Sequence, residues 1–334
     1  MAVLMYADER FLAHDTGPFH PERPDRLTAV LDGLTVHDLE EAVSWTRPRP
    51  ATDDELHRVH PSAFVRGIDQ FCRSGRTQLD ADTVVGEYSA DLARLASGAG
   101  LDAVERLRAG QADAAFVAVR PPGHHATANR AMGFCLFNHV AVAAAALAEA
   151  GERVAVVDVD AHHGNGTQDI FYGDGRVLYV SWHQQPLYPG TGLASESGSG
   201  EGAGTTLNVP VPPGATGDVY RSSVEELVAP ALARHGTTWL LLSAGYDGHR
   251  DDPLTDLGLT SGDFADLTTD LAALVPAGRV VAFLEGGYDL PALAHSSAAT
   301  VAALLGERLH PEPPSAGGPG GDVVERVRAA RDLD

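Results

Sequence analysis

Five short runs of β-branched and other apolar residues each end at a polar or glycine-rich loop, and polar side chains are rare within them. Strands that are apolar on both sides are typical of a parallel sheet whose two faces are covered by helices. The runs predict strands at Ala114–Arg120, Val154–Asp158, Val177–Ser181, Trp239–Ser243 and Val280–Leu284.

Helical periodicity fills the intervals between these runs. In Ala90–Ala109 apolar residues recur three and four positions apart, and the alanine-rich segment Asn138–Ala150 is followed by Gly151, a residue that suits the end of a helix. Further helices are predicted at Asp218–His235, Gly262–Val275 and Leu290–Leu305. The alternation predicts an α/β fold with a central, mostly parallel sheet flanked by helices.

No change of composition divides residues 1–308, which we interpret as a single domain. Residues 311–321, with the sequence PEPPSAGGPGG, are rich in proline and glycine and predict a flexible linker. A short charged helix is predicted after it, at Asp322–Leu333. Residues 309–334 are therefore expected to follow the domain as a linker and a C-terminal helix.

Composition narrows the class of protein. A chain of 334 residues can bury a large core, and its net charge of −22 disfavours nucleic acid as a partner. No apolar run reaches the roughly 18 residues that span a membrane. The only cysteines, Cys72 and Cys135, lie too far apart for a C-x-x-C metal site and indicate a reducing compartment. Because the first residues do not resemble a signal peptide, we expect a cytoplasmic protein.

Polar residues gather where the five predicted strands end. The clusters are Arg120–His125, Asp158–Gly164, Trp182–His183, Ala244–Asp247 and Glu285–Tyr288. The carboxyl ends of parallel strands share one edge of a sheet, and ligands bind beyond that edge in open α/β folds. The sequence therefore predicts one functional site built from all five loops.

Metal-binding residues are spaced at alternate positions after the second of these strands. Asp158, Asp160 and His162 fall on one face if the extended backbone continues, and neighbouring buried carboxylates repel unless a cation neutralises them. With Asp247 from a later strand end, two carboxylates and one imidazole suit a catalytic zinc with a position open for water. The alternative is a set of helix caps or surface hydrogen bonds.

Two further features offer side chains that could take part in catalysis beside a metal. His124 and His125 follow two prolines and a glycine, and adjacent histidines near a metal can serve as base and acid. Tyr288 follows two glycines and offers a hydroxyl that can stabilise an oxyanion. Taken singly, a histidine pair or a tyrosine is more often structural.

Six motifs resemble those of the histone deacetylase family, in the same order over about residues 14–305. They are HPERP at His20–Pro24, RPPGHHA at Arg120–Ala126, DVDAHHGNGT at Asp158–Thr167, YPGTG at Tyr188–Gly192, SAGYD at Ser243–Asp247 and EGGY at Glu285–Tyr288. The family includes class I and class II lysine deacetylases, acetylpolyamine amidohydrolases and acetoin-utilisation proteins. The resemblance implies an arginase-like α/β fold, one catalytic zinc and hydrolysis of an N-acetyl amine to the free amine and acetate.

The resemblance also implies roles for individual residues. The zinc ligands would be Asp160, His162 and Asp247. His125 would take a proton from the attacking water and return it to the leaving amine, with His124, paired to Asp158, as its electrostatic partner. Tyr288 would act with zinc to polarise the acetyl carbonyl.

By the same resemblance, several residues would hold the substrate. The carbonyl of Gly133 would accept the substrate amide N–H, and Phe134 and Tyr188 would sandwich the stem of an acyl-lysine. Asp82 matches a rim aspartate that holds the substrate backbone, with Asp80 as an alternative.

Two more positions line the way in and out of the implied site. Arg26 aligns with an arginine of an internal acetate channel. Leu254, seven residues after the last zinc ligand, stands at the mouth, where polyamine-selective members carry glutamate. An apolar residue there favours the aliphatic stem of acetyl-lysine over a polyamine cation, although acetylated polyamines and small N-acetyl metabolites stay open as substrates, as does the oligomeric state.

Family members also bind potassium near the zinc. The implied inner site comprises Asp158, Asp160, His162, Ser181 and the carbonyl of Trp182, and the implied outer site comprises the carbonyls of Phe171, Asp174 and Val177. Sodium or water are alternatives at both places.

Departures from the family pattern refine the interpretation. Asn165 stands where class I members have an aspartate, and asparagine at this position is the class II pattern. A neutral partner raises the pKa of His125 less than a carboxylate does. Trp182 replaces a leucine common in the family.

Two other functions fit the sequence less well than the deacetylase does. A binuclear manganese ureohydrolase on the same fold needs a carboxylate two residues after His162, where this chain has Gly164. An inactive module that only binds acetylated ligands predicts the loss of Tyr288 or of a metal ligand, and none is missing.

Overall fold

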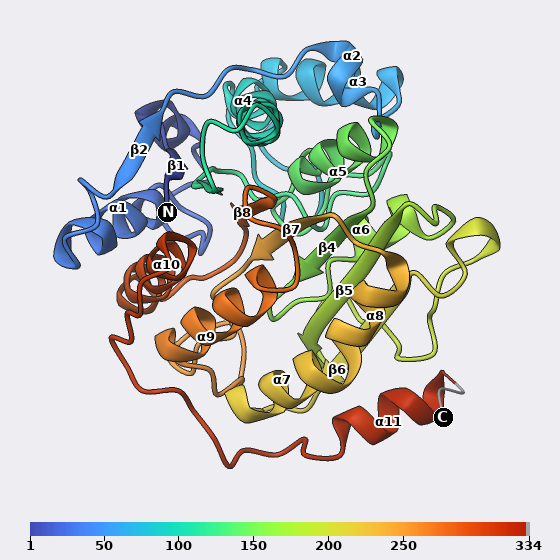
Figure 1. Ribbon diagram of the computed structural model, residues 1–334. Helices are drawn as coiled ribbons and strands as arrows, with labels where there is room; N and C mark the ends of the chain where they lie inside the picture. Colours follow the sequence, from blue (N-terminus) through green and yellow to red (C-terminus); the bar gives the residue numbers. More distant parts are fainter. Residues whose placement is uncertain (332–334) are drawn as a thin grey trace.

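The computed structural model describes residues 1–331 of the chain, and within them eight parallel strands form one sheet (Figure 1). The strands are β1 Val3–Tyr6, β2 Val43–Thr46, β3 Ala114–Val117, β4 Val154–Asp158, β5 Val177–Gln184, β6 Thr206–Val211, β7 Trp239–Ala244 and β8 Val280–Leu284. Their order across the sheet is β2-β1-β3-β8-β7-β4-β5-β6. The predicted α/β architecture is confirmed.

All five predicted strands are present. They are β3, β8, β7, β4 and β5, which lie next to one another in the sheet. Every residue of β3, β4, β5, β7 and β8 is buried, which explains their continuous apolar pattern. The prediction missed β1, β2 and β6. β2 and β6 are the two edge strands, β2 is partly exposed, and β6 contains Pro210, a residue that sheets accept at an edge.

Helices cover both faces of the sheet (Figure 1). They are α1 Asp25–Val36, α2 Asp53–Leu56, α3 Ser62–Arg73, α4 Ser89–Arg108, α5 His139–Glu149, α6 Asn165–Phe171, α7 Gly217–Ser223, α8 Ala229–His235, α9 Ser261–Ala272, α10 Leu290–Leu305 and α11 Val323–Ala330. α4 and α5 pack together on one face, and α10, with α1 and α9 beside it, packs on the other. The predicted helix Asp218–His235 is divided into α7 and α8 by a π-helical turn at Val224–Val228.

Strand register brings the functional loops to one edge. Asp158 at the end of β4 pairs with Ser181 of β5 and with Ser243 of β7, and Ser243 pairs with Phe283 of β8. Because all of these strands are parallel and nearly level, the loops that follow them leave the sheet side by side.

The segment after α10 differs from the predicted flexible linker. It runs past α9 and α7 to α11 (Figure 1), and Ser315 donates hydrogen bonds from its backbone N–H to the buried carboxylate of Asp263. α11 then buries Val323 and Val327 against the domain. Composition predicts a flexible segment, but Ser315 is hydrogen-bonded to the domain and the two valines pack against it. The predicted helix is confirmed over 323–330, and its last two residues, 332 and 333, lie outside the described residues.

Among residues 1–331, no helix is both long enough and apolar enough to cross a membrane.

Candidate active site

A cavity of about 230 Å³ opens at the carboxyl edge of the sheet. Its walls are Asp82, His125, Gly133, Phe134, His162, Leu187, Tyr188, Leu254 and Tyr288. Except for Leu187, each of these residues was a candidate from the sequence alone. They come from loops far apart in the chain, so the fold assembles the site that the strand ends predict.

Three of the candidate ligands converge below this cavity. Atoms of Asp160, His162 and Asp247 that can bind a metal all lie within 4.8 Å of one another. The His162 Nδ1 lies 2.8 Å from Asp247 Oδ2 and 3.2 Å from Asp160 Oδ1. Both carboxylates are buried, whereas His162 also borders the cavity. The arrangement therefore leaves one side of the cluster facing the space that a substrate would enter.

The surroundings of the cluster suit a divalent cation. Burial and then the nearby Asp160 carboxylate raise the pKa of Asp247 to about 7, because two negative charges share a site that water does not reach. Glycines make the room: a Cβ on Gly245 would lie 2.1 Å from Asp160 Oδ2, and one on Gly286 would lie 2.4 Å from Asp247 Oδ2. Two carboxylates and one imidazole are a zinc-compatible donor set, so these residues fit the implied metal.

Backbone N–H groups orient the two carboxylates. Gly286 N–H donates to Asp160 Oδ2 over 2.8 Å, and Ala161 N–H donates to Asp247 Oδ1 over the same distance. His162 N–H also donates to Asp160 Oδ1 over 2.9 Å, so the backbone holds both oxygens of Asp160 and one oxygen of Asp247. Such outer contacts fix ligand geometry in metal sites.

His124 lies beneath the cavity and is paired with Asp158, as the resemblance implies. Its Nδ1–H donates to Asp158 Oδ2 over 3.0 Å, and its Nε2 lies 3.8 Å from Asp160 Oδ2. Burial lowers the pKa of His124, but the charges of Asp158 and Asp160 outweigh it and raise this pKa well above its usual range. The Tyr179 hydroxyl also donates to Asp158 Oδ2, over 3.2 Å. His124 is therefore held in place as a charged group.

His125 has a different environment and lines the cavity. Its Nδ1–H donates to Asn165 Oδ1 over 2.8 Å. The Asn165 amide nitrogen lies 3.5 Å from the sulfur of Met132, which can only accept, so the amide oxygen must face His125. Burial, followed by the positive charges of His124 and His162, holds the pKa of His125 well below its usual value. His125 is thus a neutral imidazole whose Nε2 is left to accept a proton.

A tight turn presents Gly133 and Phe134 to the cavity. The backbones of Met132 and Cys135 exchange two hydrogen bonds across it, and both intervening residues have positive φ, 57° and 67°. Glycine is required at 133, because a Cβ there would lie 2.4 Å from the His125 ring. A left-handed Phe134 costs roughly 1–2 kcal/mol, which the turn sustains in order to place an aromatic ring at the cavity wall.

Aromatic rings meet edge to face around the cavity. The Tyr188 ring is nearly perpendicular to that of His125, with centroids 5.2 Å apart, and the Phe134 ring is nearly perpendicular to that of Tyr288, at 5.9 Å. Burial raises the pKa of the Tyr288 phenol well above its usual value, so its hydroxyl stays protonated and can donate. The resulting slot suits a slender, uncharged stem.

Arg26 lies behind Tyr288 and does not line the cavity. Its guanidinium carbon is 4.9 Å from the centre of the Tyr288 ring, and its Nε and Nη2 donate to the carbonyls of Gly287 and Glu285. The Glu22 carboxylate accepts a third hydrogen bond from Arg26. All of these contacts are buried, and they hold the turn that carries Tyr288.

At the rim, the geometry separates the two candidate aspartates. Asp82 lines the cavity, whereas Asp80 accepts hydrogen bonds from the backbone of Asp82 and Thr83. Burial and then the Asp80 carboxylate raise the pKa of Asp82. Asp80 therefore shapes the loop, and Asp82 is the residue that can meet a ligand.

The residues predicted to bind potassium lie in two groups. Ser181 is level with Asp158 in the sheet, while the Trp182 indole points away into the core, donates to the Ser223 hydroxyl and stacks on Tyr220. The outer group forms the turn between α6 and β5. There the carbonyl of Phe171 accepts from Asp174 N–H, and the carbonyl of Asp174 accepts from Val177 N–H. Potassium binding at either place stays a prediction.

Comparison with known proteins decides the family. Residues 20–304 match the histone deacetylase domain. The chain belongs to the histone deacetylase family. It is 38% identical to a probable deacetylase of Archaeoglobus fulgidus, covering 89% of this chain and 85% of that protein. It is also 38% identical to a histone deacetylase-like amidohydrolase of Pseudomonas aeruginosa, covering 86% of this chain and 77% of that protein.

A solved histone deacetylase structure has the same fold. The crystal structure of the HDA15 HD domain superposes with a TM-score of 0.91 at 37% identity, covering 98% of this chain and 94% of that one. The family resemblance that the six motifs indicated is confirmed. The comparisons also support a hydrolase of the deacetylase family.

Within this histone deacetylase fold, Gly164 is incompatible with the ureohydrolase alternative. That reading needs a carboxylate at this position, but a Cβ on Gly164 would lie 2.1 Å from Asp158 Oδ2 and 2.6 Å from the Tyr179 hydroxyl. No side chain fits there without displacing the Asp158 pair. Position 164 therefore cannot supply the carboxylate that a second metal would need there.

Sequence reasoning missed three residues of the site. Buried Glu285 accepts hydrogen bonds from Gly123 N–H and His124 N–H, at 2.6 and 3.1 Å, and so fixes the loop that carries the histidine pair. Asp252 accepts the backbone N–H of Tyr288 at 2.6 Å. Leu187 adds an apolar wall. Glu285 lay inside a recognised motif, but Asp252 and Leu187 carry no signal beyond their nearness to one.

Proposed function

We propose that this protein is a zinc-dependent deacetylase that hydrolyses an N-acetyl amine to the free amine and acetate. The observation that carries the proposal is the cavity in which His125 and Tyr288 stand over the cluster of Asp160, His162 and Asp247. A base, a hydroxyl donor and a metal-compatible donor set around one narrow space are the components that amide hydrolysis needs.

Asp160, His162 and Asp247 would hold the zinc. When bound, zinc supplies Lewis-acid chemistry to the amide carbonyl and to the attacking water. The protein contributes burial, which excludes bulk water, and backbone donors that keep the two carboxylates aimed at the cluster.

His125 would move the proton. With Nδ1–H committed to Asn165, Nε2 accepts a proton from water and later delivers it to the leaving amine nitrogen. His124, charged through its pair with Asp158, limits how basic His125 becomes, because two adjacent imidazolium ions repel. Asn165, as the neutral partner of His125, supports the proposal that this deacetylase is of the class II type.

Tyr288 would donate its hydroxyl proton to the acetyl oxygen as negative charge develops there. The carbonyl of Gly133 would accept the substrate amide N–H, while Phe134 and Tyr188 line the slot for the stem. Since Arg26 lies against the Tyr288 ring and holds the adjacent carbonyls, its proposed part is support of Tyr288 and of the path by which acetate leaves.

The preferred substrate class is an acetyl-lysine type of side chain. Leu254 and Leu187 make the mouth apolar on the side where they line it. An aliphatic stem gains from burial against these side chains, whereas position 254 offers no carboxylate to pair with the second cation of a polyamine. Asp82 would instead accept backbone N–H groups of a peptide substrate.

Acetate release from a panel of substrates tests the proposal. The panel contains an acetyl-lysine peptide, acetylspermidine and a small N-acetyl metabolite, each offered to metal-stripped protein and to protein reconstituted with zinc. We expect turnover of the peptide that depends on zinc. The proposal fails if the reconstituted protein releases no acetate from any of the three, or if stripped and reconstituted protein are equally active.

Potassium has a separate test. We propose that the carbonyls of Phe171, Asp174 and Val177 form an outer monovalent-ion site and that Asp158 and Ser181 contribute to an inner one. Thermal unfolding in potassium chloride against tetramethylammonium chloride at equal ionic strength measures this. A melting temperature that is the same in both salts would contradict it.

A further inference from the structure

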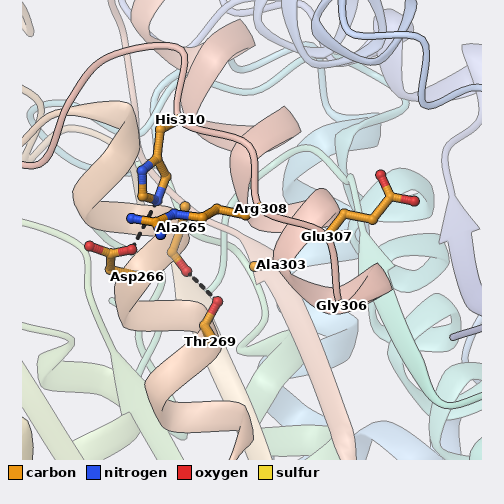
Figure 2. A pocket seen from close by; sticks show the side chains of 8 residues that line it. All are labelled: Ala265, Asp266, Thr269, Ala303, Gly306, Glu307, Arg308 and His310. Atoms are coloured by element: carbon orange, nitrogen blue, oxygen red, sulfur yellow. Dashed lines mark hydrogen bonds and ion pairs between the residues drawn. The ribbon is translucent and has the colours of Figure 1, made fainter.

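The chain after α10 forms a strap, which we define as residues 309–319. It is fastened at several points along the side of α9 and α7. His310 donates to Asp266 of α9 over 2.9 Å (Figure 2), Thr260 donates from its hydroxyl to the carbonyl of Pro313 over 2.9 Å, and Gly318 N–H donates to the hydroxyl of Thr216 over 2.8 Å. The strap lies beyond residue 304, where the match to the histone deacetylase domain ends.

Glu312 joins the strap to the loop between β7 and α9. Its Oε2 accepts from His249 Nε2 over 2.6 Å, and its Oε1 accepts from Arg250 over 2.5 Å. The same Oε2 accepts the backbone N–H of Ser261, the first residue of α9, over 3.1 Å. One carboxylate thus ties both ends of a loop that begins with the candidate ligand Asp247.

His249 is fixed in a single orientation by this contact. The backbone N–H of Asp251 donates to its Nδ1 over 3.2 Å, so the ring hydrogen is on Nε2 and points at Glu312. His249 is almost fully buried, with 2% of its area exposed. Both ring nitrogens are occupied, so these side chains form a clasp rather than a second metal site.

The clasp continues to the backbone of Tyr288. The carbonyl of His249 accepts from Asp252 N–H over 2.9 Å. The carboxylate of Asp252 in turn accepts the N–H of Tyr288 over 2.6 Å and that of Asp289 over 3.3 Å. Glu312 is therefore connected by three successive hydrogen bonds, through His249 and Asp252, to the residue proposed to stabilise the oxyanion.

We propose that Glu312 is a positioning residue, which holds the loop 248–260 and through Asp252 sets the place of Tyr288 over the cavity. This inference rests on the proposed deacetylase function. It assigns to the C-terminal strap a part in the reaction, because a hydroxyl donor displaced by about 1 Å loses much of its effect on the transition state.

The first test compares kinetics of full-length variants on the acetyl-lysine peptide. Glu312→Ala is expected to lower kcat about tenfold with KM changed less than threefold, since oxyanion stabilisation acts in the transition state. Glu312→Gln keeps an oxygen acceptor for His249 and should recover activity to within about threefold of wild type. A glutamine variant no more active than the alanine variant would count against the clasp.

Glu307→Ala is the matched control. Glu307 lies just before the strap, is exposed, and points away from His310 and Asp266 (Figure 2). It should leave kcat unchanged. An equal loss in both alanine variants would mean a general effect of charge at this end of the protein, and the proposal would be wrong.

A double-mutant cycle with Tyr288→Phe separates positioning from stability. If Glu312 acts through the Tyr288 hydroxyl, its removal should cost less than about twofold in the Tyr288→Phe background. A full tenfold loss there would overturn the proposed route.

Amide hydrogen exchange gives a readout that needs no activity. In folded Glu312→Ala protein, exchange should accelerate at 249–254 and at Tyr288, whose N–H is held by Asp252, while the core strands stay at wild-type rates. Unchanged protection of Tyr288 would overturn the inference. Wild-type protein without turnover would instead contradict the proposed function, and the exchange result would still decide whether Glu312 holds Tyr288.

Discussion

The Tyr288 phenol lies over the candidate metal cluster with its ring between Arg26 and Phe134 and its backbone N–H on Asp252. Removing only its oxygen leaves these contacts in place. We expect Tyr288→Phe to keep the fold and the zinc and to lower kcat by roughly 10² to 10³, because one oxyanion donor is worth that much. Steady-state kinetics with the acetyl-lysine peptide measure it, and a wild-type kcat would mean that Tyr288 only packs.

The adjacent histidines differ in their partners, and this difference predicts the order of two losses. His125 is hydrogen-bonded to a neutral amide and is proposed to transfer the proton, while His124 is paired with a carboxylate. His125→Ala should therefore cost more activity than His124→Ala, by about 10² to 10⁴ relative to wild type for the first. Rates of the two variants, with zinc content checked in each, decide the point, and the reverse order would exchange the assigned roles.

Leu254 leaves its side of the cavity mouth without a charged group. Its side chain lines the cavity, and its N–H donates to Asp252, so the backbone is held whichever side chain is present. Leu254→Glu should shift the kcat/KM ratio toward acetylspermidine by about tenfold, which corresponds to one added ion pair of roughly 1.4 kcal/mol. The measurement is kcat/KM for both substrates in both proteins. A wild type that already prefers acetylspermidine more than tenfold would contradict the argument.

At the scale of elements, two buried histidines brace the loops under the site. His60 Nε2 accepts from Asn138 N–H at the start of α5 while its Nδ1–H donates to the carbonyl of Ala128, and His139 Nε2–H donates to the carbonyl of Pro121. Both rings are neutral in these contacts. Burial lowers the pKa of each to about 4.

These lowered pKa values predict the direction of a pH effect on stability. Between about pH 6.5 and pH 4 the unfolded chain binds protons at both rings and the folded protein does not, so stability is lost as the pH falls through this window. The loss is on the order of 2–3 kcal/mol for each ring. Urea unfolding at pH 7 and pH 4.5 measures it. His60→Gln should unfold with a weaker dependence on pH than wild type, and an unchanged dependence would show that His60 does not titrate in this window.

At the scale of the whole molecule, the cluster of Asp160, His162 and Asp247 links the loop after β4 to the loop after β7, so metal binding should contribute to the stability of the fold. We expect one zinc per chain and a melting temperature that falls on chelation and recovers with zinc. Asp247→Ala removes one of three ligands and should leave well under one zinc per chain after dialysis. Metal analysis checks it, and full zinc content with full activity in the variant would contradict the assignment.

The strands at the centre of the sheet and the residues of the site were predictable from the sequence for a local reason. A strand buried on both faces is apolar throughout, and a polar cluster at its end marks the sheet edge where ligands bind, so Asp160, His125 and Tyr288 were recognisable one loop at a time. The edge strands lack that pattern, because β2 has exposed residues and β6 contains Pro210.

Tertiary structure decided which of these residues touch. Arg26 and Asp252 support Tyr288, and Glu285 braces the histidine pair, through contacts between residues that are far apart in the chain. Likewise, only the folded structure shows that Asp82, and not Asp80, lines the cavity. The Pro- and Gly-rich segment predicted as a flexible linker is fastened through Glu312 and Ser315 for the same reason. Composition predicts how flexible a segment is when it is isolated. The hydrogen-bond partners that hold this segment in place lie on the folded domain, and its own composition does not reveal them.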